Sequence, residues 1–277
     1  MGIDLAQLHR EWVEKTGGSE QSYREVFWII AHCLSVSWSD LHKGQVITST
    51  DDQEQRVRKY LAQYEQGMPL AYILQYINFM GLDYEIVPGV LIPRQATESI
   101  VHAALAVLKP GDRVLECGVG SGIIACSLAK HRQVDVLGID CSTQAITLAH
   151  KNILRHQCEA RVTLKCCSWY DALPQGFDLL IANPPYIEKG DPDLSTQVAE
   201  YEPETALISG DKGLADIKQI IKQANSVLNQ AGWLIIEHGY KQQDAVIMLG
   251  ESAGFVLEKK IIDPEGLARG VVLKKID

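Results

Sequence analysis

The sequence predicts an α/β protein with a small all-helical N-terminal domain, a β-hairpin linker, and a mostly parallel, doubly wound, Rossmann-like domain with an antiparallel edge. Apolar residues recur at helical spacing over residues 1–77, without a strand pattern. From residue 113 onward, apolar runs typical of buried strands alternate with helical patterns. Such alternation implies a parallel sheet with helices on both faces. The last two strand patterns, 256–262 and 270–274, follow each other closely, which indicates an antiparallel edge.

Composition restricts the classes of function. The 277 residues are 46% hydrophobic, enough for a sizeable core, and carry a net charge of −9, which argues against a broad basic surface for nucleic acid. The seven cysteines are scattered without a Cys-x-x-Cys pair, so we expect reduced thiols in a cytoplasmic protein and no metal site. No apolar run approaches the ~20 residues of a membrane span. The first residues also lack the pattern of a signal peptide.

Within the helical domain, residues 1–77, polar residues that favour helix starts precede several apolar patterns. We expect helices to begin near Ser19 or Ser22, Ser39 and Thr50. The last of these opens a charged helix over 53–66, which Gly67-Met68-Pro69 ends. The core of this domain is expected to contain Trp12, Trp28 and Trp38.

A β-hairpin is expected to link the two domains, with residues 78–92 as the linker of a second domain that runs over 78–277. Residues that favour strands occupy 79–86, a Pro88-Gly89 turn follows, and 90–92 supply the second strand. Thr97 then favours the start of the next helix as its cap.

Strands and helices alternate through the second domain. The strands are expected at 113–117, 134–139, 162–166, 177–182 and 232–237, and the helices at 122–131, 142–156, 214–229 and 240–253. Between them, residues 183–213 contain much loop. So long a loop in a compact domain is usually functional.

A glycine-rich turn, Gly118-Val119-Gly120-Ser121-Gly122, follows the first strand of this alternating region. Glycines permit positive φ and a close approach of the backbone to a ligand. A dinucleotide fingerprint needs its third glycine at position 123, which is Ile123, and a phosphate loop needs a lysine. Glu116, just before the turn, would repel a pyrophosphate but suits a cation such as the ammonium of S-adenosylmethionine. The turn therefore indicates that cofactor, with a plain strand-to-helix turn as the alternative.

Two further strand ends carry residues that suit the rest of an adenosyl group. Asp140 ends the next strand, and an acid there can accept hydrogen bonds from both ribose hydroxyls. Its alternative role is to cap the helix at Ser142. Ser168 and Trp169 follow the third strand, where they could give an adenine ring a polar contact and a flat wall. The alternative for Trp169 is packing of the loop alone.

The stretch Asn183-Pro184-Pro185-Tyr186 follows the apolar run 179–182 and indicates the reaction. Two prolines cannot continue an interior strand, so a rigid turn must lie at the carboxyl end, where open α/β sheets bind ligands. The Asn183 side-chain oxygen and the Pro184 carbonyl can each accept one N–H of a planar –NH₂ group. That presents the nitrogen to a methyl donor and supports the charge that grows on it. Tyr186 offers a flat face to the substrate, and a non-functional turn is the alternative.

In these motifs the sequence resembles the glutamine methyltransferases that modify bacterial peptide-chain release factors, over nearly its whole length. Besides the motifs above, the matching segments are 71–73, 79–81, 88–94, Glu98, 177–179, 201–203, 206–207, 210–214 and 237–239. The resemblance implies a helical domain that helps to hold the release factor and a methyltransferase domain that methylates the glutamine of a Gly-Gly-Gln loop. It also implies that 118–122, Asp140 and Trp169 hold S-adenosylmethionine, and that Asn183 to Tyr186 hold the glutamine, with Asn183 near the sulfonium as well. We expect a monomer whose partner is the release factor, without membrane or direct nucleic-acid contact.

Several positions depart from the family's pattern. Gln95 and Ala96 stand where a proline and an acid are usual, and Ser168 stands where an acid often precedes the tryptophan. Because Asn183 and Asp140 are kept, we expect that activity is retained. The affinity for the cofactor can differ from that of other family members. Two alternatives remain. One is a methyltransferase for the exocyclic amine of adenine in nucleic acid, which the net charge disfavours, and the other is a protein that keeps the fold without catalysis.

Overall fold

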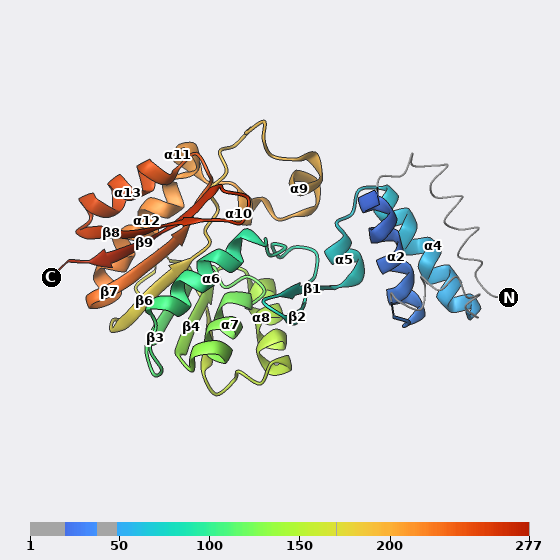
Figure 1. The fold of residues 1–277 in the computed structure, drawn as a ribbon, viewed down its shortest axis with the longest axis horizontal. Coiled ribbons are helices and arrows are strands. Elements are labelled where there is room, and N and C mark those ends of the chain that lie inside the picture. Colours follow the sequence, from blue (N-terminus) through green and yellow to red (C-terminus); the bar gives the residue numbers. More distant parts are fainter. Residues whose placement is uncertain (1–19, 38–48, 170, 277) are drawn as a thin grey trace. The chain divides into compact units, whose positions relative to one another are not determined.

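The computed structural model describes residues 20–37, 49–169 and 171–276. The chain divides into two compact units, Met1–Gln75 and Tyr76–Asp277, each with a hydrophobic core of its own. Figure 1 shows helices in the first unit and a large sheet with helices in the second. The substrate-recognition role expected for residues 1–77 stays a prediction.

In the described part of the first unit, every regular element is a helix, as predicted. Helix α2 (Glu20–Leu34) packs against α4 (Asp51–Glu65) and the short α5 (Leu70–Leu74). Their shared core contains Val26, Phe27, Ile29, Ile30, Cys33, Leu34, Val57, Leu61, Ile73 and Leu74. The start of α4 at Thr50 and its end before Gly67-Met68-Pro69 are both confirmed.

Trp28 is not a core residue, because its side of α2 is exposed. It is 47% exposed and shares that side with Arg24 and His32, which lie four residues before and after it. Ser22 lies inside α2 and does not begin it. The expected core positions Trp12 and Trp38, and the expected helix starts at Ser19 and Ser39, lie outside the described residues.

The hairpin forms, but on other residues than predicted. Strand β1 (Tyr76–Phe79) pairs antiparallel with β2 (Leu82–Glu85) around Met80-Gly81. Both turn residues have positive φ, 49° and 77°, which suits a two-residue hairpin turn. Methionine is uncommon in that conformation, so Met80 is not a signal for a turn. Residues 90–92 follow the Pro88-Gly89 turn without joining a sheet.

The second unit is built on a seven-stranded sheet in the order β5-β4-β3-β6-β7-β9-β8. Its strands are β3 (Arg113–Cys117), β4 (Asp135–Asp140), β5 (Val162–Cys166), β6 (Phe177–Ala182), β7 (Leu228–Glu237), β8 (Phe255–Ile262) and β9 (Ala268–Lys275). The pairs among β3 to β7 are parallel. Strand β9 pairs antiparallel with both β7 and β8, so the predicted antiparallel edge is confirmed.

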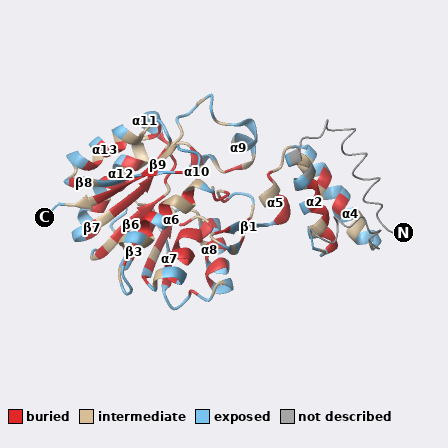
Figure 2. Cartoon of the chain, viewed as in Figure 1, coloured by how far each residue is buried: buried red, intermediate tan, exposed pale blue. Residues whose placement is uncertain are grey.

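Helices cover both faces of this sheet, and its central strands are buried between them, whereas the edge strands β5 and β8 are mostly exposed (Figure 2). One face packs against α6 (Ala96–Val107), α7 (Ile123–Arg132) and α8 (Thr143–Arg155), and the other against α12 (Ala215–Val227) and α13 (Gln243–Ser252). The loop after β6 contains the short helices α9 (Thr196–Tyr201), α10 (Glu204–Leu207) and α11 (Gly210–Gly213). Over the part of the chain that the structure describes, the helices are too short or too polar to cross a membrane.

The register of the parallel strands brings four chain segments to one edge of the sheet. Cys117 of β3 lies opposite Ile139 of β4 and Ala182 of β6, and Ala182 lies opposite Ile236 of β7. The residues that come next along these strands are Gly118, Asp140, Asn183 and Glu237. The order of the strands reverses between β3 and β6, which is where open α/β sheets bind ligands.

Thr50→Ala tests the start of α4. The Gln53 N–H donates to the Thr50 hydroxyl oxygen at 3.3 Å, and the Thr50 N–H donates to the Gln53 side-chain oxygen at 2.9 Å. The substitution removes the hydroxyl that accepts from Gln53, and this loss should destabilise α4 by about 1 kcal/mol. Hydrogen exchange of the amides of residues 51–65 measures the change. Gln55→Ala, an exposed substitution in the same helix, is the control, and equal protection in both variants would contradict the prediction.

Candidate active site

The glycine turn between β3 and α7 is fixed by β4 and α8. The Gly118 N–H donates to the Ile139 carbonyl at 2.9 Å. Gly118, Gly120 and Gly122 have φ of 79°, 53° and 82°, a region that side chains rarely adopt. A Cβ on Gly122 would lie 3.2 Å from Ala149 of α8, whereas nothing lies within 4 Å of a Cβ on Gly120. The turn is therefore closely packed at its end and open in its middle, where a ligand has room.

Three residues that were predicted to contact the cofactor are buried around this turn: Glu116, Val119 and Ser121. The Val119 side chain packs against Gly138 of β4. No described side chain hydrogen-bonds to either carboxyl oxygen of Glu116. Burial raises the pKa of this carboxyl well above its ordinary value, which favours the protonated acid. An orphaned carboxyl beneath the turn fits a ligand that brings a cation or a hydrogen-bond donor.

Asp140 holds the loops on either side of it. Its Oδ2 accepts from the Gly120 N–H at 3.0 Å, and its Oδ1 accepts from the Ser142 N–H at 2.9 Å. The cap of α8 is Ser142, whose hydroxyl oxygen accepts from the Ala145 N–H at 3.2 Å. Each carboxylate oxygen has two lone pairs. Asp140 therefore keeps capacity for two ribose hydroxyls while it shapes the glycine turn.

Trp169 lies beside the glycine turn. A Cβ placed on Gly118 would be 3.6 Å from the indole Cζ3. The indole N–H donates to Asp216 Oδ1, in the first turn of α12, at 3.3 Å, which fixes the ring. Ser168 is half-buried, and its backbone N–H donates to Asp171 Oδ2 at 2.8 Å. The half-buried ring is thus held next to the turn, close enough to form one wall of an adenine site.

The Asn183-Pro184-Pro185-Tyr186 turn is held by loops that follow it in the chain. The side-chain Nε2 of Gln242 donates to the Tyr186 carbonyl at 2.9 Å and to the Lys212 carbonyl at 3.1 Å. Gly213 is so close that a Cβ there would lie 2.0 Å from the Tyr186 carbonyl oxygen. These contacts, together with two fixed proline φ angles, make the turn rigid.

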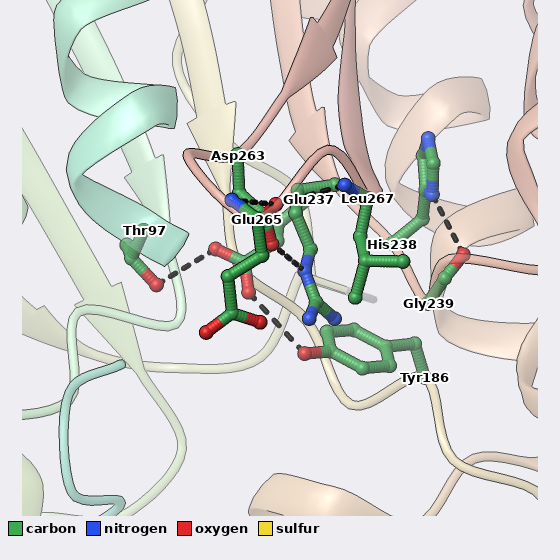
Figure 3. A network of polar contacts seen from close by, with 9 residues as sticks. Thr97, Tyr186, Glu237, His238, Gly239, Asp263, Glu265 and Leu267 are labelled. Carbon is green, nitrogen blue, oxygen red and sulfur yellow. Dashed lines mark hydrogen bonds and ion pairs between the residues drawn. The ribbon is translucent and has the colours of Figure 1, made fainter. Parts of the chain in front are cut away.

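A buried polar network connects this turn with β7 and α6 (Figure 3). Glu237 accepts from the Thr97 hydroxyl at 2.8 Å and from the Tyr186 hydroxyl at 3.3 Å. The Thr97 oxygen also accepts from Asn183 Nδ2 at 3.3 Å. Thr97 is therefore not the predicted helix cap. Because α6 begins at Ala96 after Gln95, position 97 lies inside the first turn, and its hydroxyl serves the network instead.

Burial raises the pKa of the Glu237 carboxyl to about 7, while its two hydroxyl donors and the guanidinium groups of Arg269 and Arg94 act in the opposite direction. Each arginine is itself paired with a buried acid. Arg94 lies 2.6 Å from Glu202, and Arg269 lies 2.7 Å from Asp263. Because each arginine is also neutralised by another carboxylate, the two guanidinium groups lower the pKa of Glu237 less than burial raises it.

A cavity of about 570 Å³ opens beside this turn. Asn183, Pro184 and Tyr186 line it, together with Arg94, Arg269 and residues of the loop after β6. Pro185, the other predicted substrate contact, is buried and does not line it. The volume falls within the range of small-molecule and side-chain sites. The cavity therefore places the predicted substrate residues where a ligand can reach them.

The structure brings the two predicted groups of residues together. A Cβ on Gly118 would lie 3.9 Å from the Asn183 carbonyl oxygen. Sequence reasoning gave no site role to Thr97, Arg94, Gly213, Glu237, Gln242 and Arg269. Glu237 did carry a signal, because it is an acid at the end of a buried strand, as Asp140 is. The others act through contacts between segments that are distant in the chain, which a single sequence does not reveal.

Comparisons with known proteins agree with this arrangement. A family model described as a methyltransferase domain matches residues 108–260, and one described as the PrmC N-terminal domain matches residues 9–74. The chain is 38% identical over 257 residues to the release factor glutamine methyltransferase of Geobacter sulfurreducens, covering 92% of this chain and 90% of that protein. It is 32% identical over 249 residues to the protein of the same name from Escherichia coli K12, covering 89% and 90%.

Solved structures share the fold at low sequence identity. A methyltransferase from Pyrococcus furiosus gives a TM-score of 0.54 at 19% identity, covering 81% of this chain and 98% of that one. The ribosomal protein L11 methylase from Lactobacillus delbrueckii gives 0.51 at 21% identity, covering 69% and 84%. These likenesses concern the fold alone.

Gly213→Ala should destabilise the protein more than Gly190→Ala. The two glycines have similar φ, 80° and 84°, so both variants carry a comparable strain from positive φ. Only at Gly213 does the added methyl meet a backbone oxygen, whereas nothing lies within 4 Å at Gly190. We expect the melting temperature of Gly213→Ala to fall by several degrees more, as calorimetry can measure. Equal melting temperatures would show that the loops yield to the methyl group.

Glu237→Gln should change how stability depends on pH. A carboxyl whose pKa rises from 4.5 to about 7 on folding stabilises the protein fully below pH 4.5 and loses that contribution as pH rises through 7. Glutamine does not titrate, so the variant should gain stability relative to the wild type from pH 5 to pH 8, by up to roughly 3 kcal/mol. Chemical denaturation at each pH measures this. Exposed Glu159→Gln is the control, and parallel curves for wild type and Glu237→Gln would contradict the prediction.

Proposed function

The chain belongs to the family of release factor glutamine methyltransferases, and from this premise we propose how its site performs the reaction. The enzyme is an S-adenosylmethionine-dependent protein-glutamine N-methyltransferase that methylates the side-chain amide of a release-factor glutamine. We propose that this glutamine is the one in the Gly-Gly-Gln loop, that the reaction occurs in the cytoplasm, and that residues 1–77 help to hold the release factor.

We propose that the cofactor is held along the ends of β3, β4 and β5. When bound, it supplies a methyl group on a cationic sulfur. The glycine turn gives close backbone approach, Asp140 accepts from the ribose hydroxyls, and Trp169 forms a wall for the adenine ring. Support comes from the space at Gly120 and from the buried carboxyl of Glu116. A cationic ammonium group beside this carboxyl would favour its ionised form and offset the effect of burial.

The substrate amide is proposed to bind at Asn183 and Pro184. One observation carries this assignment. Asn183 Nδ2 is engaged by Thr97, so its Oδ1 remains as an acceptor at the cavity. With the Pro184 carbonyl as the second acceptor, the two oxygens hold one N–H each and fix the plane of the amide. They also support the positive charge that develops on the nitrogen as its bond to the methyl carbon forms, until one of its protons leaves to water.

Glutamine is favoured over adenine as the planar –NH₂ substrate. A base would have to be extracted from a stack and held by a basic groove, but the chain carries a net charge of −9. Arg94 and Arg269, the guanidinium groups at the cavity, are both paired with buried acids. The names of the curated relatives also favour glutamine.

Transfer of labelled methyl groups tests this function. The protein is incubated with methyl-labelled S-adenosylmethionine and either a bacterial release factor or adenine-containing DNA. We expect label on the release factor, and Asn183→Ala should lower the rate by at least about 100-fold, the usual effect of one lost oriented group. Asn225→Ala, exposed at the far end of α12, is the control with unchanged transfer.

Other outcomes would overturn the proposal. Label on DNA alone would identify a nucleic-acid methyltransferase. Absence of label with the cofactor still bound, measured by calorimetry with S-adenosylhomocysteine, would identify a protein without catalysis. Unchanged transfer by Asn183→Ala would refute the amide-holding role.

A further inference from the structure

The Thr97 hydroxyl lies between two groups of the site and contacts both. It donates to Glu237 Oε2 at 2.8 Å, and its oxygen accepts from Asn183 Nδ2 at 3.3 Å. Thr97 is 1% exposed and Glu237 is fully buried, so water does not compete for these bonds. Neither residue lines the cavity, which places them behind the groups that do.

A hydroxyl has a single hydrogen, and that limits what Thr97 can offer to Asn183. Because its hydrogen is committed to the carboxylate of Glu237, only lone pairs remain on the side of Asn183. Lone pairs select the –NH₂ end of the Asn183 amide and turn its Oδ1 the other way. Without this partner the two ends of an amide are nearly equal in shape, so either end could face the substrate.

We propose that Thr97 and Glu237 are positioning residues that fix which end of the Asn183 amide faces the substrate. This inference rests on the proposed function of Asn183 as an acceptor for the substrate N–H. In the wrong orientation, Asn183 would present its own N–H groups to the substrate –NH₂, and two donors cannot pair. The orientation therefore matters for transfer more than the mere presence of the amide.

The same carboxyl also holds the other end of the turn. Glu237 Oε1 accepts from the Tyr186 hydroxyl at 3.3 Å. The two polar side chains of this turn that line the cavity, Asn183 and Tyr186, are therefore fixed through one acid on β7 (Figure 3). A carboxylate accepts from both hydroxyls at once. A protonated acid would donate to one of them. If it donates to Thr97, the hydrogen of the Thr97 hydroxyl is no longer committed to Glu237 and can be donated to Asn183 instead.

Protonation of Glu237 therefore gives a second readout. The charged or titratable groups that face it are Arg94 before α6, Tyr186 of the turn and Arg269 of β9, and the two arginines are held by Glu202 and Asp263. Burial raises the pKa of Glu237 to about 7. The rate of transfer in the wild type should thus fall as pH drops below about 7, and Glu237→Gln should remove this acid limb.

Thr97→Val and Thr97→Ser distinguish the proposal from a packing role. Valine keeps the volume and loses the hydroxyl, whereas serine keeps the hydroxyl and loses the methyl group. We expect Thr97→Val to lower kcat about tenfold, the effect of a lost buried hydrogen bond. Thr97→Ser should stay within about twofold of wild type, with the affinity for S-adenosylhomocysteine unchanged in both. Thr163→Val, exposed on β5, is the matched control.

Each result decides the matter. A packing role would reverse the order, with Thr97→Ser the slower variant, and would overturn the proposal, as would wild-type kcat in Thr97→Val. If Thr97→Val does not fold, the pH profile of Glu237→Gln decides, and an unchanged acid limb would overturn it. Absent transfer in the wild type, or full transfer in Asn183→Ala, would instead refute the proposed function itself.

Discussion

The parallel hydrogen-bond register at the centre of the sheet is the constraint on which the site depends. Because Cys117 and Ala182 lie opposite each other, the residues after them begin their turns side by side. A slip of one residue would move every side chain of a strand to the other face. The side chains of β3 and β6 pack closely against different helices on the two faces of the sheet, and this packing opposes such a slip. The site is therefore a property of the whole sheet, and its loops only complete it.

Three acids at or near the strand ends differ in their hydrogen-bond partners. Asp140 accepts from two backbone N–H groups, and Glu237 accepts from two hydroxyls. Glu116 has no side-chain partner among the described residues. The first arrangement shapes a loop, the second holds side chains, and the third leaves a place for a donor from outside the protein. The same residue class thus serves three purposes according to its partners.

Elements with strong local signals in the sequence are predicted correctly. Strands 113–117, 162–166 and 177–182 have their predicted bounds. The first and third are mainly apolar, and the second alternates between apolar and polar residues, both of which are signals of a strand. The hairpin was placed wrongly because Met80, at positive φ, gives no turn signal. Trp28 was misplaced because apolar character alone does not say which side of a helix is covered. The Thr97 network could not be predicted, since it joins positions up to 140 residues apart in the chain.

Strand β9 pairs with β7 and β8 from a position between them, although it is the last of the three in the sequence. A chain that emerges from the ribosome in order therefore forms β7 before the strand that covers its edge exists. Until β9 arrives, that edge offers unpaired backbone groups to other chains. Arg269 also belongs to β9, so the cavity lacks part of its lining until then. The pairing of β9 therefore completes the cavity and protects the edge of β7 from aggregation at the same late stage of synthesis.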